Sequence, residues 1–291
     1  MIIKQFANAP KFSKLQSFNV ILQTGNRADI VAAFDTLKND VDFQGLGWRA
    51  AFAKLETVFH TSAPQFAIFA LGGNSKLPFV SFSSLPGVTC PGAGECIKFC
   101  YSFRAWRYPS AYARQVQNTF LLRFNNAAIS AEFAAIGAAR IETGFDFRLY
   151  VDGDFSSTTD VQFWMSELKQ TPHCRAYGYS KSFAALLAFD LIDTWPKNYQ
   201  LNISGGHNAT PAMILYVKAL PITRGEFVAV SIGRKVKSTD HGTAETNAAL
   251  RQAMPGVKIF PCPGACGACT GRGHACGMPE LKGRVIAIAM H

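Results

Sequence analysis

The sequence predicts an α/β protein built on a partial or full parallel (β/α) barrel. Between residues 145 and 260, short apolar runs that fit strands alternate with segments of helical apolar spacing. The strands recur about every 25 to 30 residues, which is the size of a βα unit. Short polar or glycine-containing turns follow each strand, as is typical of a parallel sheet. A doubly wound open sheet fits the same periodicity and stays the alternative.

Residues 1–75 are expected to form an N-terminal α+β layer that packs on the main domain. Residues 18–23 look like a strand, and residues 29–37 and 48–59 have the apolar spacing of helices. This part contains no motif with a recognisable chemical function. A role in packing or in shaping a substrate site is therefore the interpretation.

Residues 76–291 are expected to be the barrel domain, and no linker separates the two parts. The alternating residues 79–83 predict a strand, Pro86-Gly87 turns the chain, and Pro109 opens a helix. A second helix is expected at 131–141. The repeat then predicts strands at 147–151, 176–179, 199–203, 227–232 and 257–260, separated by helices at 161–168, 183–191, 212–219 and 244–254.

The composition is that of a globular protein, because 48% of the 291 residues are hydrophobic and only 16% are charged. The net charge of +10 suggests a polyanionic partner, and it fits nucleic acid, an anionic cofactor or simple solubility equally. The first residues lack the apolar core of a signal peptide, and no apolar run is long enough to span a bilayer. We therefore expect a cytoplasmic protein with no membrane partner, in which clustered thiols bind metal.

Cys90, Cys96 and Cys100 form the first cysteine group, with C-x5-C-x3-C spacing. Proline and glycine between them wrap the backbone, so that three sulfurs can face one point. Three thiolates leave one position of a metal centre open for chemistry. The alternative is three buried apolar cysteines in a turn-rich loop.

Cys262, Cys266, Cys269 and Cys276 form the second cysteine group, with C-x3-C-x2-C-x6-C spacing. Four thiolates close either a zinc site or a four-iron cluster. The small residues between them and the Cys-Pro start favour the cluster. Cys174 stands alone and is expected to be a small buried apolar residue, with a fourth ligand to the first metal centre as the alternative.

Several short pieces of the sequence form a recognisable set: Leu77-Pro78, Phe82-Ser83, Leu85-Pro86, the first cysteine loop, Arg148 with Gly153-Asp154-Phe155, residues 179–182 and 202–204, and the last cysteines. Together they resemble the gene product 88 family of phage and plasmid proteins. The layout also resembles radical S-adenosylmethionine enzymes, although their usual loop is C-x3-C-x2-C. That resemblance implies two [4Fe-4S] clusters, with S-adenosylmethionine at the first, and a cofactor-binding role for Gly153 and Asp154.

Other candidate residues follow the strands, where ligands gather in parallel α/β folds. Tyr179 and Lys181 are candidates for catalysis, and Ser204 and Arg234 for cofactor binding. Ordinary turn chemistry is the alternative for all of them. Asp152 and Asp154 could instead bind a divalent metal for hydrolysis.

Residues 98–123 interleave basic and aromatic side chains without an acid. This pattern suits single-stranded nucleic acid, which pairs its phosphates and stacks its bases. A helix with its aromatic residues in the core fits as well. The leading hypothesis is thus an iron–sulfur enzyme related to radical S-adenosylmethionine proteins. The second is a nucleic-acid-binding or regulatory protein whose metal centres are structural or sense redox state.

Overall fold

The computed structural model describes residues 10–72, 77–237, 239–267, 269–270 and 273–290. Its centre is an eight-stranded sheet of order β1-β2-β3-β4-β5-β6-β8-β7, in which only β1 and β2 pair antiparallel. The strands are β1 Ala70–Leu71, β2 Val80–Ser81, β3 Phe145–Leu149, β4 Cys174–Ser180, β5 Tyr199–Ser204, β6 Thr223–Val230, β7 Ile259–Pro261 and β8 Val285–Ala289. The predicted α/β class is confirmed. In the described chain the edge strands β1 and β7 do not pair, so a closed barrel is not confirmed.

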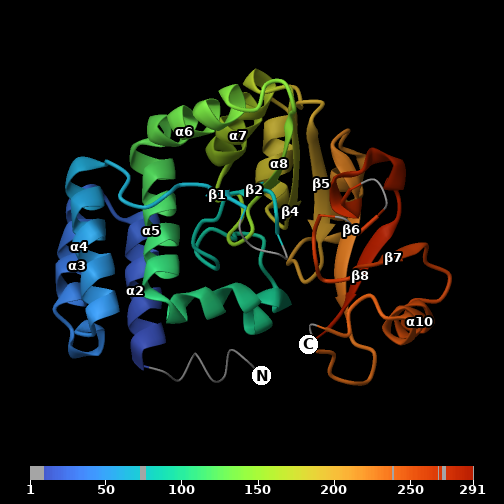
Figure 1. Ribbon diagram of the computed structural model, residues 1–291, viewed down its shortest axis with the longest axis horizontal. Coiled ribbons are helices and arrows are strands. Elements are labelled where there is room, and N and C mark those ends of the chain that lie inside the picture. The colour runs from blue at the N-terminus through green and yellow to red at the C-terminus, as the bar shows by residue number, and fades with distance from the viewer. Residues whose placement is uncertain (1–9, 73–76, 238, 268, 271–272, 291) are drawn as a thin grey trace.

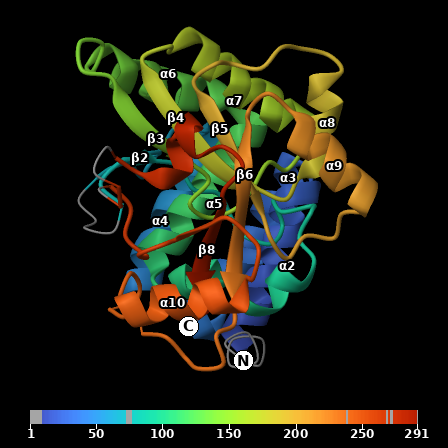
Figure 2. The ribbon, with the colours of Figure 1, turned by 90° about the vertical axis from the view of Figure 1, so that its right-hand side faces the viewer.

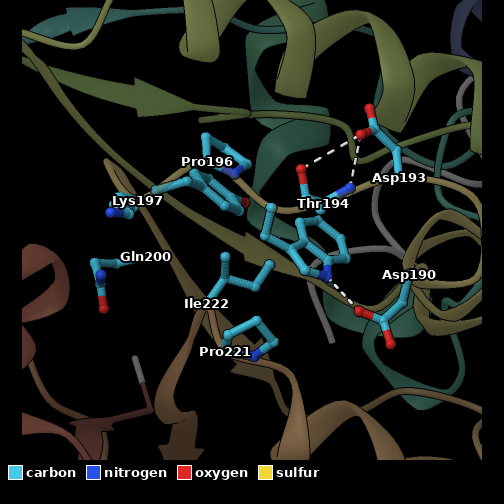
Figure 3. Close-up of a pocket in the computed structure, with 10 residues that line it drawn as sticks. Asp190, Asp193, Thr194, Pro196, Lys197, Gln200, Pro221 and Ile222 are labelled. Atoms are coloured by element: carbon cyan, nitrogen blue, oxygen red, sulfur yellow. Dashed lines mark hydrogen bonds between the residues drawn. The ribbon is translucent and has the colours of Figure 1, made fainter.

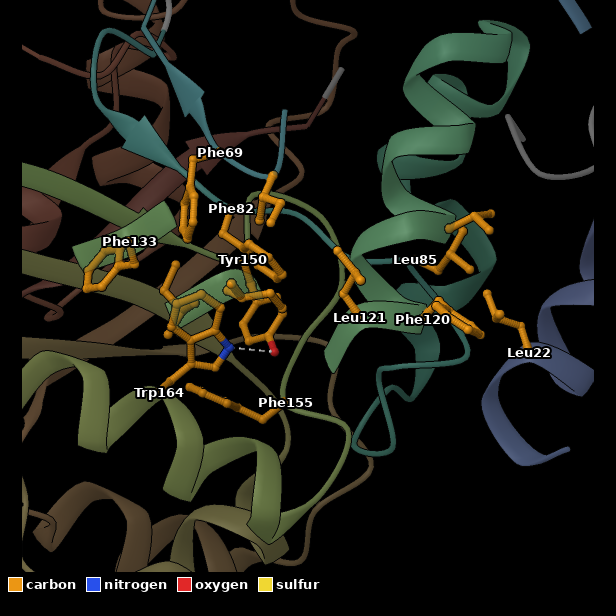
Figure 4. Packing of buried hydrophobic residues seen from close by; sticks show 14 of the residues in the cluster. Leu22, Phe69, Phe82, Leu85, Phe120, Leu121, Phe133, Tyr150, Phe155 and Trp164 are labelled. Atoms are coloured by element: carbon orange, nitrogen blue, oxygen red, sulfur yellow. Dashed lines mark hydrogen bonds between the residues drawn. The ribbon is translucent and has the colours of Figure 1, made fainter. Parts of the chain in front are cut away.

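Helices cover the outer face of the sheet (Figure 1). They are α6 Asn126–Ala138, α7 Thr158–Gln170, α8 Phe183–Asp190, α9 Pro211–Ala219 and α10 Ala244–Ala253. Alternate side chains of β3 point toward them. The Phe147 ring lies 5.0 Å from that of Phe133 in α6 and 5.7 Å from that of Trp164 in α7. Figure 4 shows this aromatic core, which fixes the helices on one side of the strands.

Four helices form a bundle beside the sheet, namely α2 Pro10–Thr24, α3 Arg27–Lys38, α4 Leu46–Thr61 and α5 Pro109–Phe124 (Figure 1). The predicted helices at 29–37 and 48–59 are confirmed, but the predicted strand at 18–23 is wrong, because these residues belong to α2. Phe12, Leu15 and Leu22 are buried along one face of that helix. The described part of the N-terminal layer is therefore mainly helical, and strand β1 within it joins the main sheet.

The inner face of the sheet carries no helix of the repeat. Arg148 on β3, Tyr177 and Tyr179 on β4, and Asn202 on β5 alternate with outward residues and point to this side. The C-terminal segment lies across it, and its short 3-10 helix η4 (Ala275–Gly277) contacts β4 and β5 (Figure 2). No helix in the described ranges is both long and apolar enough to cross a bilayer.

Candidate functional site

The first cysteine group docks on the carboxyl ends of β4 and β5. The Gly94 and Cys96 N–H groups both donate to the Gly206 carbonyl, at 3.0 and 3.2 Å, and the Asn208 N–H donates to the Gly92 carbonyl at 3.1 Å. Ala93 and His207 form an antiparallel bridge. The loop is thus attached to the edge of the sheet at which parallel α/β proteins bind ligands.

Gly92 explains how the loop comes so close to β4. A Cβ atom at this position would lie 1.7 Å from the Lys181 carbonyl oxygen and 2.4 Å from its carbon. Both atoms are backbone and cannot rotate away. Only glycine allows the first cysteine group to reach the end of β4.

The Asp152-Gly153-Asp154 segment, which follows β3, packs against the residues that lead into the first cysteine loop. Gly153 has a φ of +82°, and a Cβ there would lie 2.0 Å from the Ser84 hydroxyl. The Thr89 hydroxyl in turn accepts a hydrogen bond from the Asp154 N–H at 3.3 Å. Glycine is therefore required at 153 for packing.

The Asp154 carboxylate is buried and fully engaged by the chain itself. It accepts hydrogen bonds from the Ser180 hydroxyl (2.7 Å), the Lys181 N–H (2.7 Å) and the Phe155 N–H (2.8 Å). Burial raises its pKa, while these donors oppose the shift. The geometry gives Asp154 a positioning role, and the cofactor-binding role of Gly153 and Asp154 stays a prediction.

The Asp152 carboxylate has its own hydrogen-bond partner, apart from those of Asp154. Its carboxylate accepts a hydrogen bond from the Gln115 amide at 3.0 Å, and burial raises its pKa. Among the described residues, no three His, Cys, Asp or Glu side chains stand close enough together to hold a metal ion. This is true of both cysteine groups as well. All eight cysteines, Cys174 among them, are free thiols in the structure.

The second cysteine group lies on the inner face of the sheet. The Tyr179 hydroxyl donates to the Cys276 sulfur at 2.6 Å, and the Asn202 amide donates to the Cys276 carbonyl at 2.9 Å. At the other end of the loop, the Cys262 N–H donates to the Ala287 carbonyl of β8 at 2.8 Å. Strands β4, β5 and β8 thus position this group together.

Each of the four sulfurs in the second group has a donor. Besides Tyr179 at Cys276, the Gly264 N–H donates to the Cys262 sulfur at 3.4 Å and the Ala275 N–H to the Cys269 sulfur at 3.2 Å. An Arg148 guanidinium nitrogen lies 3.9 Å from the Cys266 sulfur. Donors of this kind stabilise negative charge on sulfur and tune metal-bound thiolates.

Burial keeps the metal-free thiols protonated. It raises the pKa of Cys262 to about 11, and it raises the pKa of Cys90 and of Cys276 to about 12. It also raises the pKa of Cys100 and of Cys269. A metal that binds here must displace protons, so its uptake would depend on pH.

Two cations stand near the cysteines without a carboxylate partner at ion-pair distance in the described chain. The Arg148 guanidinium lies over the Tyr179 ring, 5.0 Å from its centre, and the Lys181 ammonium donates to the Ser204 hydroxyl at 2.7 Å. The structure therefore brings Tyr179, Lys181 and Ser204 to one end of the sheet. Arg234 is instead exposed and pairs with Glu245 of α10 at 3.0 Å.

Sequence reasoning did not select Arg148 or His274 as site residues. The alternation along β3 could have identified Arg148, because Phe147 and Leu149 face the helices and residue 148 must face the other way. The centroid of the His274 ring lies 4.2 Å from that of Tyr177 and 4.7 Å from that of Phe79. That contact joins distant segments, so no local pattern predicts it.

The expectation that Cys174 is a buried apolar residue is confirmed, because it is fully buried at the start of β4 within the outer core.

The basic aromatic stretch at residues 98–123 is only partly available to a ligand. Phe103, Trp106 and Tyr112 are buried, so the prediction that nucleic-acid bases stack on these three rings is wrong. Arg123 donates to the Leu22 and Gly25 carbonyls at the end of α2. The exposed members are Lys98, Tyr101, Arg104, Arg107, Tyr108 and Arg123.

A groove of about 590 Å³ opens at the other end of the strands, around Trp195 (Figure 3). Two of its carboxylates are already engaged by other groups of the chain. The Trp195 indole N–H donates to Asp190 at 2.6 Å, and Asp193 accepts from the Thr194 N–H and pairs with Lys169. It holds none of the cysteines or predicted site residues.

The fold and site define an α/β protein whose mostly parallel sheet is covered on one face by helices and on the other by a cysteine-rich segment. The chain belongs to the gene product 88 family, whose family model matches residues 53–277. A search of curated proteins and a search of solved structures each returned no match.

Proposed function

We propose that this chain is an iron–sulfur protein with two four-iron clusters. Cys90, Cys96 and Cys100 would hold the first, and Cys262, Cys266, Cys269 and Cys276 would hold the second. The observation that carries the proposal is the second group, in which each sulfur has a hydrogen-bond donor. Such clusters supply one-electron redox chemistry when bound.

The charge of the site supports an anionic centre at the second group. Arg148 is a half-buried cation with no carboxylate at ion-pair distance among the described residues, and it faces the Cys266 sulfur. A partly buried cation without a direct ion pair is unfavourable, and Asp152 interacts with Arg148 only beyond ion-pair distance. An iron–sulfur centre with four thiolate ligands is negatively charged and would supply the missing charge.

We further propose that the first group serves a radical S-adenosylmethionine-like enzyme on a partial barrel. Three thiolates leave a metal position open, and the loop lies at the carboxyl edge of an open sheet with helices on one face. In this role Asp154 positions Ser180 and Lys181, and Gly92 holds the loop against them. Such a protein belongs in a reducing compartment such as the cytoplasm.

Anaerobic purification with iron, sulfide and zinc analysis tests the proposal. Wild-type protein should carry about eight irons, and Cys100→Ala and Cys269→Ala should each carry about four. Cys174→Ala is the matched control, since this cysteine is buried in the outer core. It should keep the wild-type iron content.

Two results would contradict the proposal in different ways. Zinc without iron at the second group would make that site structural, as four thiolates also suit zinc. Iron that survives both Cys100→Ala and Cys269→Ala would show that neither group holds it. Loss of only one cluster from either variant would support separate centres.

A second candidate function is binding of single-stranded nucleic acid. Its support is the surface of 3-10 helix η3 (Tyr101–Arg107) and its neighbours, where Tyr101 is 57% exposed and Tyr108 is 65% exposed beside exposed Arg104 and Arg107. Arg104→Ala with Arg107→Ala should weaken oligonucleotide binding and reduce its salt dependence. Exposed Arg251 in α10 provides the control substitution. Salt-independent or absent binding would eliminate this function.

A further inference from the structure

Lys181 and Ser204 place an ammonium group and a hydroxyl group side by side at the carboxyl ends of adjacent strands. Ser180 and Ile203 are register partners in β4 and β5, so the next residues, Lys181 and Ser204, lie side by side. The Lys181 ammonium donates to the Ser204 hydroxyl at 2.7 Å. Lys181 is half-buried and Ser204 is only 9% exposed.

The backbone of this pair is held rigidly from three sides. The Asp154 carboxylate accepts from the Lys181 N–H at 2.7 Å and from the Ser180 hydroxyl at 2.7 Å. The Ser182 N–H donates to the same Ser180 hydroxyl at 3.0 Å. Gly92 of the first cysteine loop packs against the Lys181 carbonyl. A side chain placed this firmly is preorganised for binding.

The ammonium of Lys181 retains donors for a ligand. Ser204 is its one hydrogen-bond partner within the described chain, and an ammonium has three donors. The Asp154 carboxylate, which interacts electrostatically with Lys181, uses its oxygens on Ser180, Phe155 and the Lys181 backbone. The charge of Lys181 is therefore not matched by a direct ion pair.

The surroundings favour an anionic small molecule over a neutral one. Arg148 adds a second cation without a carboxylate partner on the same inner face of the sheet. Burial lowers the pKa of His207 and the charge of Lys181 lowers it further, against an opposing effect of Glu226, so this neighbour is a neutral imidazole at pH 7. A hydroxyl and an ammonium at one point suit the oxygens of a carboxylate or phosphate group.

We propose that Lys181 and Ser204 bind the oxyanion group, carboxylate or phosphate, of a small-molecule ligand seated beside the first cysteine loop. This inference deepens the proposed function and rests on it only for the ligand's place next to a metal centre. Lys181 contributes charge and Ser204 contributes a hydroxyl that can donate to the same group. Arg234, which pairs with Glu245, takes no part.

Isothermal titration calorimetry on the full chain tests this site, with S-adenosylmethionine as the carboxylate probe and inorganic phosphate as the phosphate probe. Methylthioadenosine, which lacks the aminocarboxylate arm, separates recognition of the carboxylate from recognition of the nucleoside. Lys181→Met should weaken binding of the recognised probe about 10- to 100-fold, as expected for a lost charge-assisted hydrogen bond. Lys181→Arg should restore part of it.

Ser204→Ala provides a second variant that keeps the charge, and it should weaken the same probe by about 3- to 10-fold. Lys258→Met is the control, since this exposed lysine precedes β7 at the other end of the strands. It should bind as wild type does. Circular dichroism would verify that each variant is folded, and Ser204→Ala alone decides the matter if Lys181→Met is not.

Iron analysis of the same samples separates the two proposals. Probe binding that depends on Lys181 in protein without iron would support the anion site and contradict the proposed clusters. Iron-loaded Lys181→Met and Ser204→Ala that bind both probes like wild type would overturn the anion site alone. Wild-type protein that binds neither probe would also overturn it. Loss of iron from Lys181→Met would overturn the anion site as well, because the role of Lys181 would then be to stabilise the cysteine thiolates that hold the metal.

Discussion

The Gly92→Ala substitution tests the docking of the first cysteine loop most directly. The new Cβ would lie 1.7 Å from the Lys181 carbonyl oxygen, whereas ordinary contacts begin near 3.4 Å. The loop must therefore withdraw from β4. Withdrawal breaks the three backbone hydrogen bonds that hold it to Gly206 and Asn208. At about 1 kcal/mol each, their loss should lower the free energy of unfolding by about 3 kcal/mol.

Urea denaturation of metal-free protein measures this effect without depending on any metal. Gly45→Ala is the matched control, because Gly45 has a φ of −63° and no atom lies within 4 Å of its added Cβ. Because Gly45 is the N-cap of α4, where alanine is less favourable than glycine, we expect a loss there of at most about 1 kcal/mol. If Gly92→Ala were as stable as Gly45→Ala, the described contact between the loop and Lys181 would be wrong. Iron content of the same variant should also fall.

Three further predictions concern buried polar groups. Burial raises the pKa of Asp160 to about 6 from the ordinary value of 3.8, so the folded state favours the protonated carboxyl. The stability that this group contributes is therefore complete below pH 3.8 and is lost as the pH rises through about 6. Urea denaturation between pH 4 and 7.5 should show this loss, of at most about 3 kcal/mol, in wild type and not in Asp160→Asn. Arg148→Met removes a cation beside Cys266 and should lower the second cluster's reduction potential by up to about 100 mV in a redox titration, with Arg148→Lys intermediate. Unchanged potentials would contradict this contact. Arg224 is fully buried and donates to Asn202 and to two C-terminal carbonyls, so Arg224→Met should cost about 3 kcal/mol in urea denaturation, and exposed Arg251→Met almost nothing.

The repeat of strands and helices was predictable because each element carries its own apolar spacing. The strand expected at 18–23 failed because that window is too short to reveal a period. Over the longer segment, Phe12, Leu15, Asn19 and Leu22 are all buried and recur at helical intervals of three and four residues. Strand β8 was not predicted. Its insertion between β6 and β7 depends on sheet order, which no local pattern encodes.

The cysteine groups could be identified from spacing, but their surroundings could not. The hydrogen bonds from the first loop to Gly206 join residues more than 100 positions apart, as does that from Arg148 to Cys266. The same limit applies to Asp154. Its position after β3 was clear from the sequence, yet its partners Ser180 and Lys181 lie at the end of the next strand. A ligand-binding carboxylate and a positioning carboxylate look alike until those partners are known.

The end of β4 is the structural link between the two cysteine groups. Tyr179 donates to the Cys276 sulfur of the second group, and Lys181 packs against Gly92 of the first. Ser180, between them, is held by Asp154. Successive residues of a strand point to opposite faces, so these three neighbours contact different partners. The two groups thus meet at three consecutive residues, and Lys181 is the one of the three whose charged end remains available to a ligand.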